Sequence, residues 1–233
     1  MGIVFAIVSV VAAYLMGAIP FGVAIVRVVS GKDVRSVGSG RTGGTNAMRA
    51  AGFGAGLLTA ILDILKGTLA VWLASALTGG VHWIEVLAGV MAVLGHNYSI
   101  FAAQRVTSES GRTRLKFSGG AGGAPSVGAA SGLWIWSALI MIPLGALILF
   151  GVGYASVTTM SVGLIATAIF AVRAIFFGGP WEYVAYGITI FVLQVWALRP
   201  NIKRLLEGTE RMIGWRARRR EAKMAAQSGS QPE

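Results

Sequence analysis

The sequence predicts an all-α, polytopic integral membrane protein with about seven transmembrane helices. Hydrophobic residues make up 55% of its 233 residues and charged residues 12%, about half the share that covers a soluble domain. Lys and Arg outnumber Asp and Glu by 20 to 9. These basic residues lie between long apolar stretches, which is typical of membrane proteins with positive cytoplasmic loops. A nucleic-acid surface would instead gather them on one soluble face.

Composition also limits the chemistry. The chain has no Cys, which excludes disulfides, thiolate metal sites and cysteine nucleophiles. It has two His, at positions 82 and 96, too few for a metal centre built on several histidines. We therefore expect no metal ion and no cofactor.

Six apolar stretches are long enough to cross a bilayer, which takes about 20 residues of helix. The first contains Pro20, and it is too long, and lacks the basic start, to be a cleaved signal peptide. The stretches cover residues 3–29, 55–77, 83–101, 120–153, 160–177 and 181–198.

The positions of the basic residues predict the topology. The loops 31–49 and 102–117 each hold four Lys or Arg, and the tail after Leu198 holds nine, so all three belong in the cytoplasm. A single crossing by 120–153 would put the tail outside, whereas two crossings give seven spans, an outside N-terminus and a cytoplasmic C-terminus. Because 34 residues are few for two spans, at least one helix should be short or broken, near the glycines at 119–128.

Three regions follow from this topology. Residues 1–200 form the transmembrane domain, and residues 201–226 form a cytoplasmic segment in which basic residues alternate with Leu, Ile and Trp. That pattern suits a helix in an anionic lipid interface. Residues 227–233 are expected to form a disordered tail.

Two charged residues stand inside the second apolar stretch. Asp63 and Lys66 are three residues apart, so they can pair on one helix face. Ionisable residues inside a membrane are usually functional or face the bundle interior. The pair is therefore either part of a site or a structural ion pair.

The loop 38–49 has the chemistry of a phosphate-binding loop. Its glycines let backbone N–H groups approach an anion, the hydroxyls of Ser39 and Thr45 can donate, and Arg49 can bind phosphate through two parallel hydrogen bonds. No Gly-Lys-Ser/Thr sequence closes the loop, so it is not a nucleotide P-loop. A flexible connector is the alternative.

A second glycine-rich stretch, 116–126, again offers backbone donors and hydroxyls, with Lys116 at its edge. Close helix packing by small residues is the alternative. His96 and Asn97 end the preceding span near both loops. A single His at such a place is more often a structural hydrogen-bonding group than a general base.

Taken in order, these motifs resemble the bacterial acyl-phosphate:glycerol-3-phosphate acyltransferase family of the PlsY type. The resemblance extends over most of the chain. The matching residues are Gly17 to Pro20, Gly38-Ser39-Gly40 with Thr45, Asn46 and Arg49, Asp63 to Gly67, Gly95-His96-Asn97, Phe117 to Gly122, Tyr154 to Ser156, and Asn201 to Glu210.

The resemblance implies an enzyme of phospholipid biosynthesis in the bacterial cell membrane, with its site open to the cytoplasm. It would transfer an acyl group from acyl phosphate to glycerol 3-phosphate. Ser39 and Arg49 would be catalytic, and Ser118 to Gly122 would cradle the acyl phosphate. The remaining substrate-binding residues implied are Arg41, Thr45, Asn46, His96, Lys116, Ser118, Gly119, Gly120, Gly122, Ser156 and Asn201.

The chain departs from the family pattern at several positions. Ser118 and Ala121 stand where the family carries loop lysines, and Leu198 replaces a histidine, while Arg41 and Lys116 could restore the positive charge. Two alternatives are a catalytically impaired relative that binds phosphate-bearing lipid precursors, and a small anion transporter. No internal repeat supports the transporter.

Overall fold

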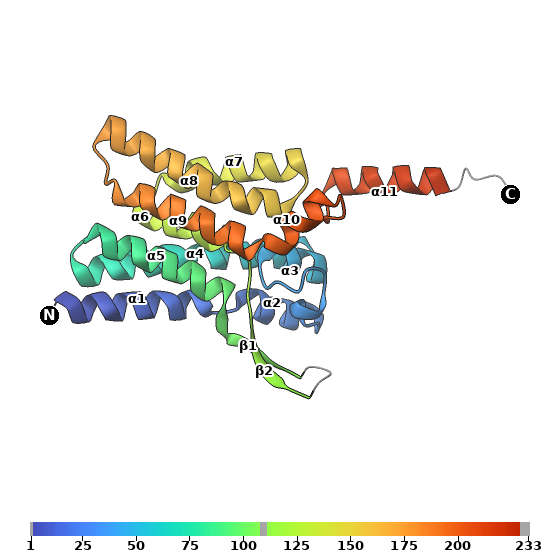
Figure 1. Cartoon of the computed structure of the whole chain (residues 1–233), viewed down its shortest axis with the longest axis horizontal. Coiled ribbons are helices and arrows are strands. Elements are labelled where there is room, and N and C mark those ends of the chain that lie inside the picture. Colours follow the sequence, from blue (N-terminus) through green and yellow to red (C-terminus); the bar gives the residue numbers. More distant parts are fainter. Residues whose placement is uncertain (1, 108–110, 229–233) are drawn as a thin grey trace.

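The computed structural model describes residues 2–107 and 111–228. It is a bundle of helices that run along one long axis, with a β-hairpin projecting from its side (Figure 1). The helices are α1 (Gly2–Ala18), α2 (Phe21–Ser30), α3 (Gly44–Ala51), α4 (Phe53–Thr78), α5 (His82–Asn97), α6 (Gly123–Leu133), α7 (Ser137–Val152), α8 (Ala155–Phe177), α9 (Glu182–Ala197), α10 (Arg199–Leu206) and α11 (Trp215–Ser228), with a 3₁₀ turn at Val34–Ser36.

The first apolar stretch is divided into α1 and α2 at Pro20. Proline cannot donate a backbone hydrogen bond and pushes the residue before it out of helical geometry. The carbonyl of Ile19 is thereby freed from the helix, and it accepts a hydrogen bond from Lys66 Nζ at 2.9 Å. The break in α1–α2 therefore supplies a partner to an ammonium group buried inside the bundle.

Residues 120–153 contain two helices, and the first is short, as expected; that both cross the membrane stays a prediction. α6 has only 11 residues and α7 has 16. α6 packs so closely on α4 that a Cβ added at Gly128 would clash with the Ile64 carbonyl. Small residues thus let helix backbones approach, which is how helices associate in membranes.

Three helical segments in the described residues are long and apolar enough to cross a membrane: 2–30, α4 and α8. α7 and α9 are shorter apolar helices. Large apolar side chains cover the outside of the bundle, as at Val28, Phe176 and Phe177, which are 86%, 73% and 77% exposed. An apolar outer surface suits a lipid environment.

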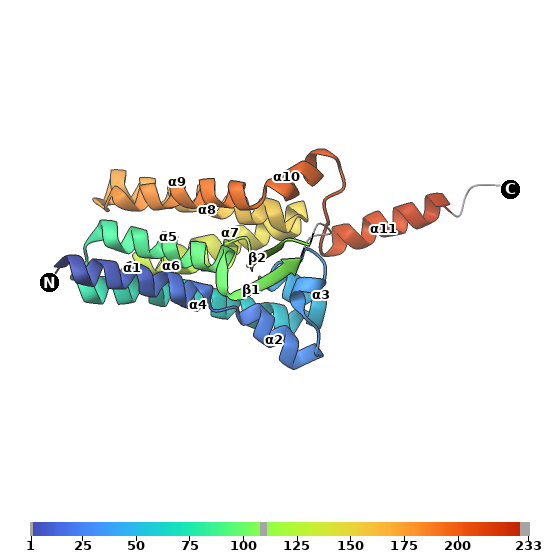
Figure 2. The same cartoon turned by 60° about the horizontal axis from the view of Figure 1, so that its bottom comes forward.

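The two ends of the bundle differ. The N-terminus and the turns α4–α5 and α8–α9 lie at one end, and α2, α3, α10 and α11 lie at the other (Figures 1 and 2). The basic loop 31–49 and the basic tail therefore share one end. About seven spans and the sidedness of the termini stay predictions.

The all-α prediction needs one correction. β1 (Ser99–Thr107) and β2 (Thr113–Ser118) pair antiparallel, with Arg105 opposite Leu115 and Val106 opposite Arg114. α5 accordingly ends at Asn97, short of the predicted end at 101. Beta-branched residues and the local cross-strand pairs favour a hairpin here over continued helix.

The C-terminal region is helical over α10 and α11, and α11 extends away from the bundle (Figure 2). α11 includes Gln227 and Ser228, the first two residues of the expected disordered tail. The rest of that tail, 229–233, lies outside the described residues.

Candidate functional site

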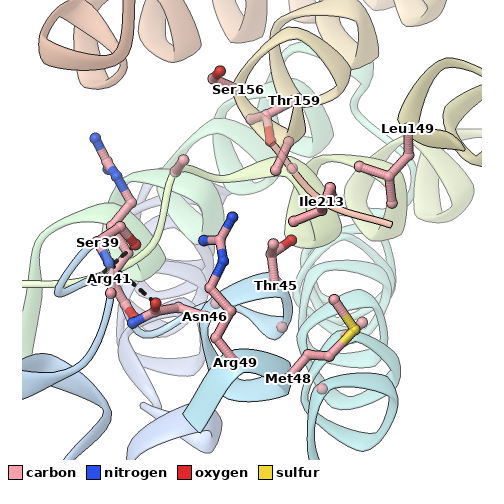
Figure 3. Close-up of a pocket in the computed structure, with 18 of the residues that line it drawn as sticks. Ser39, Arg41, Thr45, Asn46, Met48, Arg49, Leu149, Ser156, Thr159 and Ile213 are labelled. Atoms are coloured by element: carbon pink, nitrogen blue, oxygen red, sulfur yellow. Dashed lines mark hydrogen bonds between the residues drawn. The ribbon is translucent and has the colours of Figure 1, made fainter. Parts of the chain in front are cut away.

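A cavity of about 710 Å³ opens at the end of the bundle that carries the basic loops. Its walls come from the loop 38–49, α3, the first half of α4, the start of α6, the α7–α8 turn and the chain after Leu198. One side is polar, with Ser39, Thr45 and Arg49, and the other is apolar, with Leu149 and Ile213 (Figure 3). The cavity can therefore hold an anionic group together with an alkyl chain.

Asn46 holds the loop before α3 in shape. Its Oδ1 atom accepts a hydrogen bond from the Ser39 amide at 3.2 Å, and Nδ2 lies within 2.9 Å of the carbonyls of Val34, Val37 and Arg41. These contacts occupy both the oxygen and the nitrogen of the Asn46 side chain, so Asn46 orders the loop and is not available to a ligand. The hydroxyl of the neighbouring Ser39 is available.

Arg41 connects three segments that are far apart in the sequence. Its Nη1 atom donates to the Gly120 carbonyl at 3.0 Å, and its Nη2 atom donates to the Ala197 carbonyl at 2.6 Å. Burial, followed by the positive charge of Arg204, lowers the pKa of Arg41 below its ordinary value. Its guanidinium thus ties both glycine-rich loops to the end of α9 while it lines the cavity.

Arg49 extends from α3 into the cavity beside Thr45 (Figure 3). Within the described residues, its guanidinium makes no hydrogen bond and no ion pair. Burial, followed by the positive charge of Arg211, lowers the pKa of Arg49. A half-buried cation with an unused hydrogen-bonding fork is well suited to bind an anion bidentately.

Glu210 organises the opposite polar wall. Its Oε1 atom accepts hydrogen bonds from Asn201 Nδ2 at 2.7 Å and Ser156 Oγ at 3.2 Å, and its Oε2 atom accepts one from Arg204 Nε at 2.8 Å. Glu210 is 7% exposed, so its charge is compensated by these donors. Ser156 and Asn201 reach the cavity as expected, and the carboxylate that positions them comes from 54 residues after Ser156.

The predicted pair of Asp63 and Lys66 is present, with 2.7 Å between Lys66 Nζ and Asp63 Oδ1. Lys66 Nζ also lies 3.0 Å from His96 Nδ1. Asp63 and His96 line the cavity, whereas Lys66 lies behind them. In the described part of the chain, no three His, Asp or Glu side chains lie close enough to hold a metal ion.

The second glycine-rich loop uses much of its backbone internally. The Gly120 amide donates to the His96 carbonyl at 3.0 Å, and the Gly119 carbonyl accepts from the Thr42 amide at 3.2 Å. Side chains would not fit here, because a Cβ at Gly120 would overlap the His96 ring. Gly119 and Gly120 therefore pack the two loops together and do not line the cavity.

The part of this loop that reaches the cavity is the start of α6. Gly122, at φ +84°, and Gly123 line it, and the first N–H groups of a helix have no intrahelical partner. Ser118 is buried near Gln104, 3.4 Å between Ser118 Oγ and Gln104 Oε1. Lys116 is exposed on β2, outside the cavity, so the structure does not bring it to the site.

The sequence reading missed four charged residues of the cavity wall: Arg204, Glu210, Arg211 and Arg218. Arg211 and Arg218 belong to the part of the tail that was interpreted as an interfacial segment, whereas Arg204 and Glu210 lie within the stretch Asn201 to Glu210 that resembles the family. That resemblance was one available signal, and Glu210, 9 residues after Asn201, was another, since an acidic residue among many cations often has a structural partner.

The chain is similar to known proteins over most of its length. The model of the family described as glycerol-3-phosphate acyltransferase matches residues 7–208. A glycerol-3-phosphate acyltransferase of Thermus thermophilus is 39% identical over 89% of this chain and 95% of its own length, and one of Moorella thermoacetica is 38% identical over 90% and 98%. The crystal structure of the integral membrane protein PlsY in its glycerol 3-phosphate form superposes on this chain with a TM-score of 0.74. The two sequences are 32% identical, and the match covers 90% of this chain and 96% of PlsY. Its lysophosphatidic acid form gives a TM-score of 0.73.

Proposed function

Because this chain belongs to the glycerol-3-phosphate acyltransferase family, we propose that its cavity transfers a fatty acyl group from acyl phosphate to the sn-1 hydroxyl of glycerol 3-phosphate. The protein is a membrane glycerol-3-phosphate acyltransferase, an enzyme of phospholipid biosynthesis. The acyl phosphate donor and the residue roles below are our proposal. The products are lysophosphatidic acid and inorganic phosphate.

Arg49 and Ser39 are proposed to bind the phosphate of glycerol 3-phosphate, with Thr45 beside them. The supporting observation is the Arg49 guanidinium, which extends into the cavity without a partner in the described residues (Figure 3). Ser156 and Asn201, held by Glu210, face the same space and would orient the glycerol hydroxyls. Fixing the acceptor in this way lowers the entropic cost of reaction.

The acyl carbonyl would lie near the start of α6, where Gly122 and Gly123 line the cavity. Unpaired N–H groups at a helix start stabilise a developing oxyanion. His96 would contribute as well. Lys66 Nζ lies 3.0 Å and Asp63 Oδ1 lies 3.5 Å from His96 Nδ1. We propose that the ammonium, the nearer group, donates to Nδ1, which leaves the ring proton on Nε2 and makes His96 a donor toward the substrate.

The cavity wall holds no Cys and no Ser–His pair at hydrogen-bond distance among the described residues, so we propose direct transfer. The acceptor oxygen forms a bond to the acyl carbon, and the bond from that carbon to the phosphate oxygen breaks, its electron pair passing to the phosphate. The hydroxyl proton moves to the departing phosphate, which acts as the base.

We place the protein in the cytoplasmic membrane of a bacterium with the cavity toward the cytoplasm. The support is that the cavity lies at the end that carries the basic loop 31–49 and the basic tail, and such loops stay inside. In this orientation a water-soluble acceptor enters from the cytoplasm, and the acyl chain reaches the apolar wall from the bilayer.

The test is an assay of purified protein with palmitoyl phosphate and glycerol 3-phosphate that follows phosphate and lysophosphatidic acid together. We expect equimolar release of both, and much slower turnover with palmitoyl-CoA as donor. Faster turnover with palmitoyl-CoA would overturn the donor assignment. Binding of both substrates without product would support an impaired relative, and transport of phosphate into sealed vesicles without product would support a transporter.

A further inference from the structure

The chain after residue 208, where the family match ends, returns to the cavity. Arg211, Ile213, Gly214 and Arg218 all line it. We call residues 211–218 the capping segment. A basic tail that only touched lipid would have no reason to contribute to this wall, so the capping segment needs a separate explanation.

The capping segment is attached to the end of α7. The Ile213 amide donates to the Gly153 carbonyl at 2.9 Å, and Trp215 Nε1 donates to the Phe150 carbonyl at 3.2 Å. Preceding it, Glu210 is fixed by Arg204 and Asn201. Hydrogen bonds within the capping segment and directly before it therefore fix its position at the cavity wall.

The capping segment brings positive charge that no carboxylate in the described wall neutralises. The wall contains two carboxylates, and Asp63 pairs with Lys66 while Glu210 pairs with Arg204. Among the described residues, the guanidinium groups of Arg211 and Arg218 have no hydrogen-bond or ion-pair partner. Arg211 also lies close enough to Arg49 to lower its pKa. Like charges gathered in this way favour a bound anion.

The same segment carries an apolar surface. Ile213 lies between the two arginines in sequence and lines the cavity near Leu149 (Figure 3), and Phe150 belongs to the same cavity wall. Glycerol 3-phosphate has a short polar body and gains little from such a wall. A molecule with a phosphate group attached to a long alkyl chain matches both the cations and the apolar side chains.

We propose that the capping segment is the binding site for the phosphate of the amphiphilic substrate, the acyl donor, with Arg211 and Arg218 contacting the phosphate and Ile213 contacting the start of the acyl chain. This inference rests on the proposed function. Lysophosphatidic acid shares the same chemistry, so the test separates donor from product.

The experiment compares the double variant R211A/R218A with R219A in nanodiscs of phosphatidylcholine. Arg219 is on the same helix as Arg218 but does not line the cavity, so it controls for loss of charge from α11. We measure equilibrium binding of palmitoyl phosphate, KM for each substrate and the inhibition constant of lysophosphatidic acid. Each lost charge-assisted hydrogen bond weakens binding by about tenfold.

We expect the double variant to weaken palmitoyl phosphate binding and raise its KM at least about tenfold. The KM of glycerol 3-phosphate should rise by a clearly smaller factor, because Arg49 remains to bind the acceptor, and R219A should leave both values unchanged. An equal effect of R219A would overturn the proposal in favour of non-specific surface charge. A rise only in the KM of glycerol 3-phosphate would overturn it in favour of an acceptor site. A rise only in the inhibition constant of lysophosphatidic acid would reassign the segment to the product.

Direct binding separates this inference from the proposed function. If the wild type binds palmitoyl phosphate but does not turn over, the proposed function fails, while the comparison of R211A/R218A with R219A still decides the capping segment. If the wild type turns over and the double variant behaves like R219A, the inference fails alone.

Discussion

Lys66 Nζ lies 3.0 Å from His96 Nδ1 and 2.7 Å from Asp63 Oδ1, so one ammonium group joins an ion pair to the ring that lines the cavity. All three side chains are buried. The relationship joins α4 to the end of α5 directly behind the substrate site. It shows how a charged residue is accommodated inside an apolar helix.

Replacing Lys66 with Met should lower the free energy of unfolding by about 3–5 kcal/mol, because Asp63 is left as a buried charge without its cation. The double variant D63N/K66M should regain a large part of this loss. Unfolding in detergent measures both, and L65M is the control, since Leu65 is 47% exposed on the same helix. Equal stability of K66M and L65M would rule out a stabilising ion pair.

Replacing Arg49 with Ala should reduce kcat/KM by at least about a hundredfold, because the variant loses the cation that we propose binds the acceptor phosphate. R49K should recover part of the activity, since Lys keeps the charge but not the fork. Arg27, exposed on α2 and outside the cavity, provides the control variant R27A. Full activity of R49A would remove Arg49 from the site.

Replacing Glu210 with Ala should weaken both activity and stability, because Ser156, Asn201 and Arg204 lose their common acceptor. We expect the free energy of unfolding to fall by about 2–5 kcal/mol, as it does when one partner of a buried ion pair is removed. E207A is the matched control: Glu207 pairs with Lys203 at 3.8 Å on the surface, and such pairs contribute about 0–1 kcal/mol. Equal effects would contradict the buried role of Glu210.

Replacing Gly38 with Ala should raise the KM of glycerol 3-phosphate strongly. At φ +54° a side chain is strained, and its Cβ would also overlap Asn46 Oδ1, which displaces Ser39. Gly31 is the control, because it has φ +69° but open space around an added Cβ, so G31A should cost only about 1 kcal/mol of stability. If G31A and G38A have the same KM, the loop shape does not control acceptor binding.

Much of the fold was predictable, because the features that form and end a helix are properties of the local sequence. Apolar length, Pro20 and the glycines near 120 depend only on the residues themselves, and they predicted the helices and the two-helix region after the second loop. The pairing of β1 with β2 was not predicted, since two isolated strands become stable only when they pair with each other.

The sequence by itself determined the membrane class and the family resemblance, and it predicted phosphate chemistry for the first loop, because hydropathy and side-chain type belong to each residue. Tertiary structure decided which groups remain free to meet a ligand. The side-chain amide of Asn46 is used in hydrogen bonds within the loop, and Lys116 lies on β2, outside the cavity. Arg218, in contrast, lines the cavity although it lies near the far end of the chain. Hydrogen-bond partners and cavity walls come from segments distant in sequence, so only the packed chain assigns them.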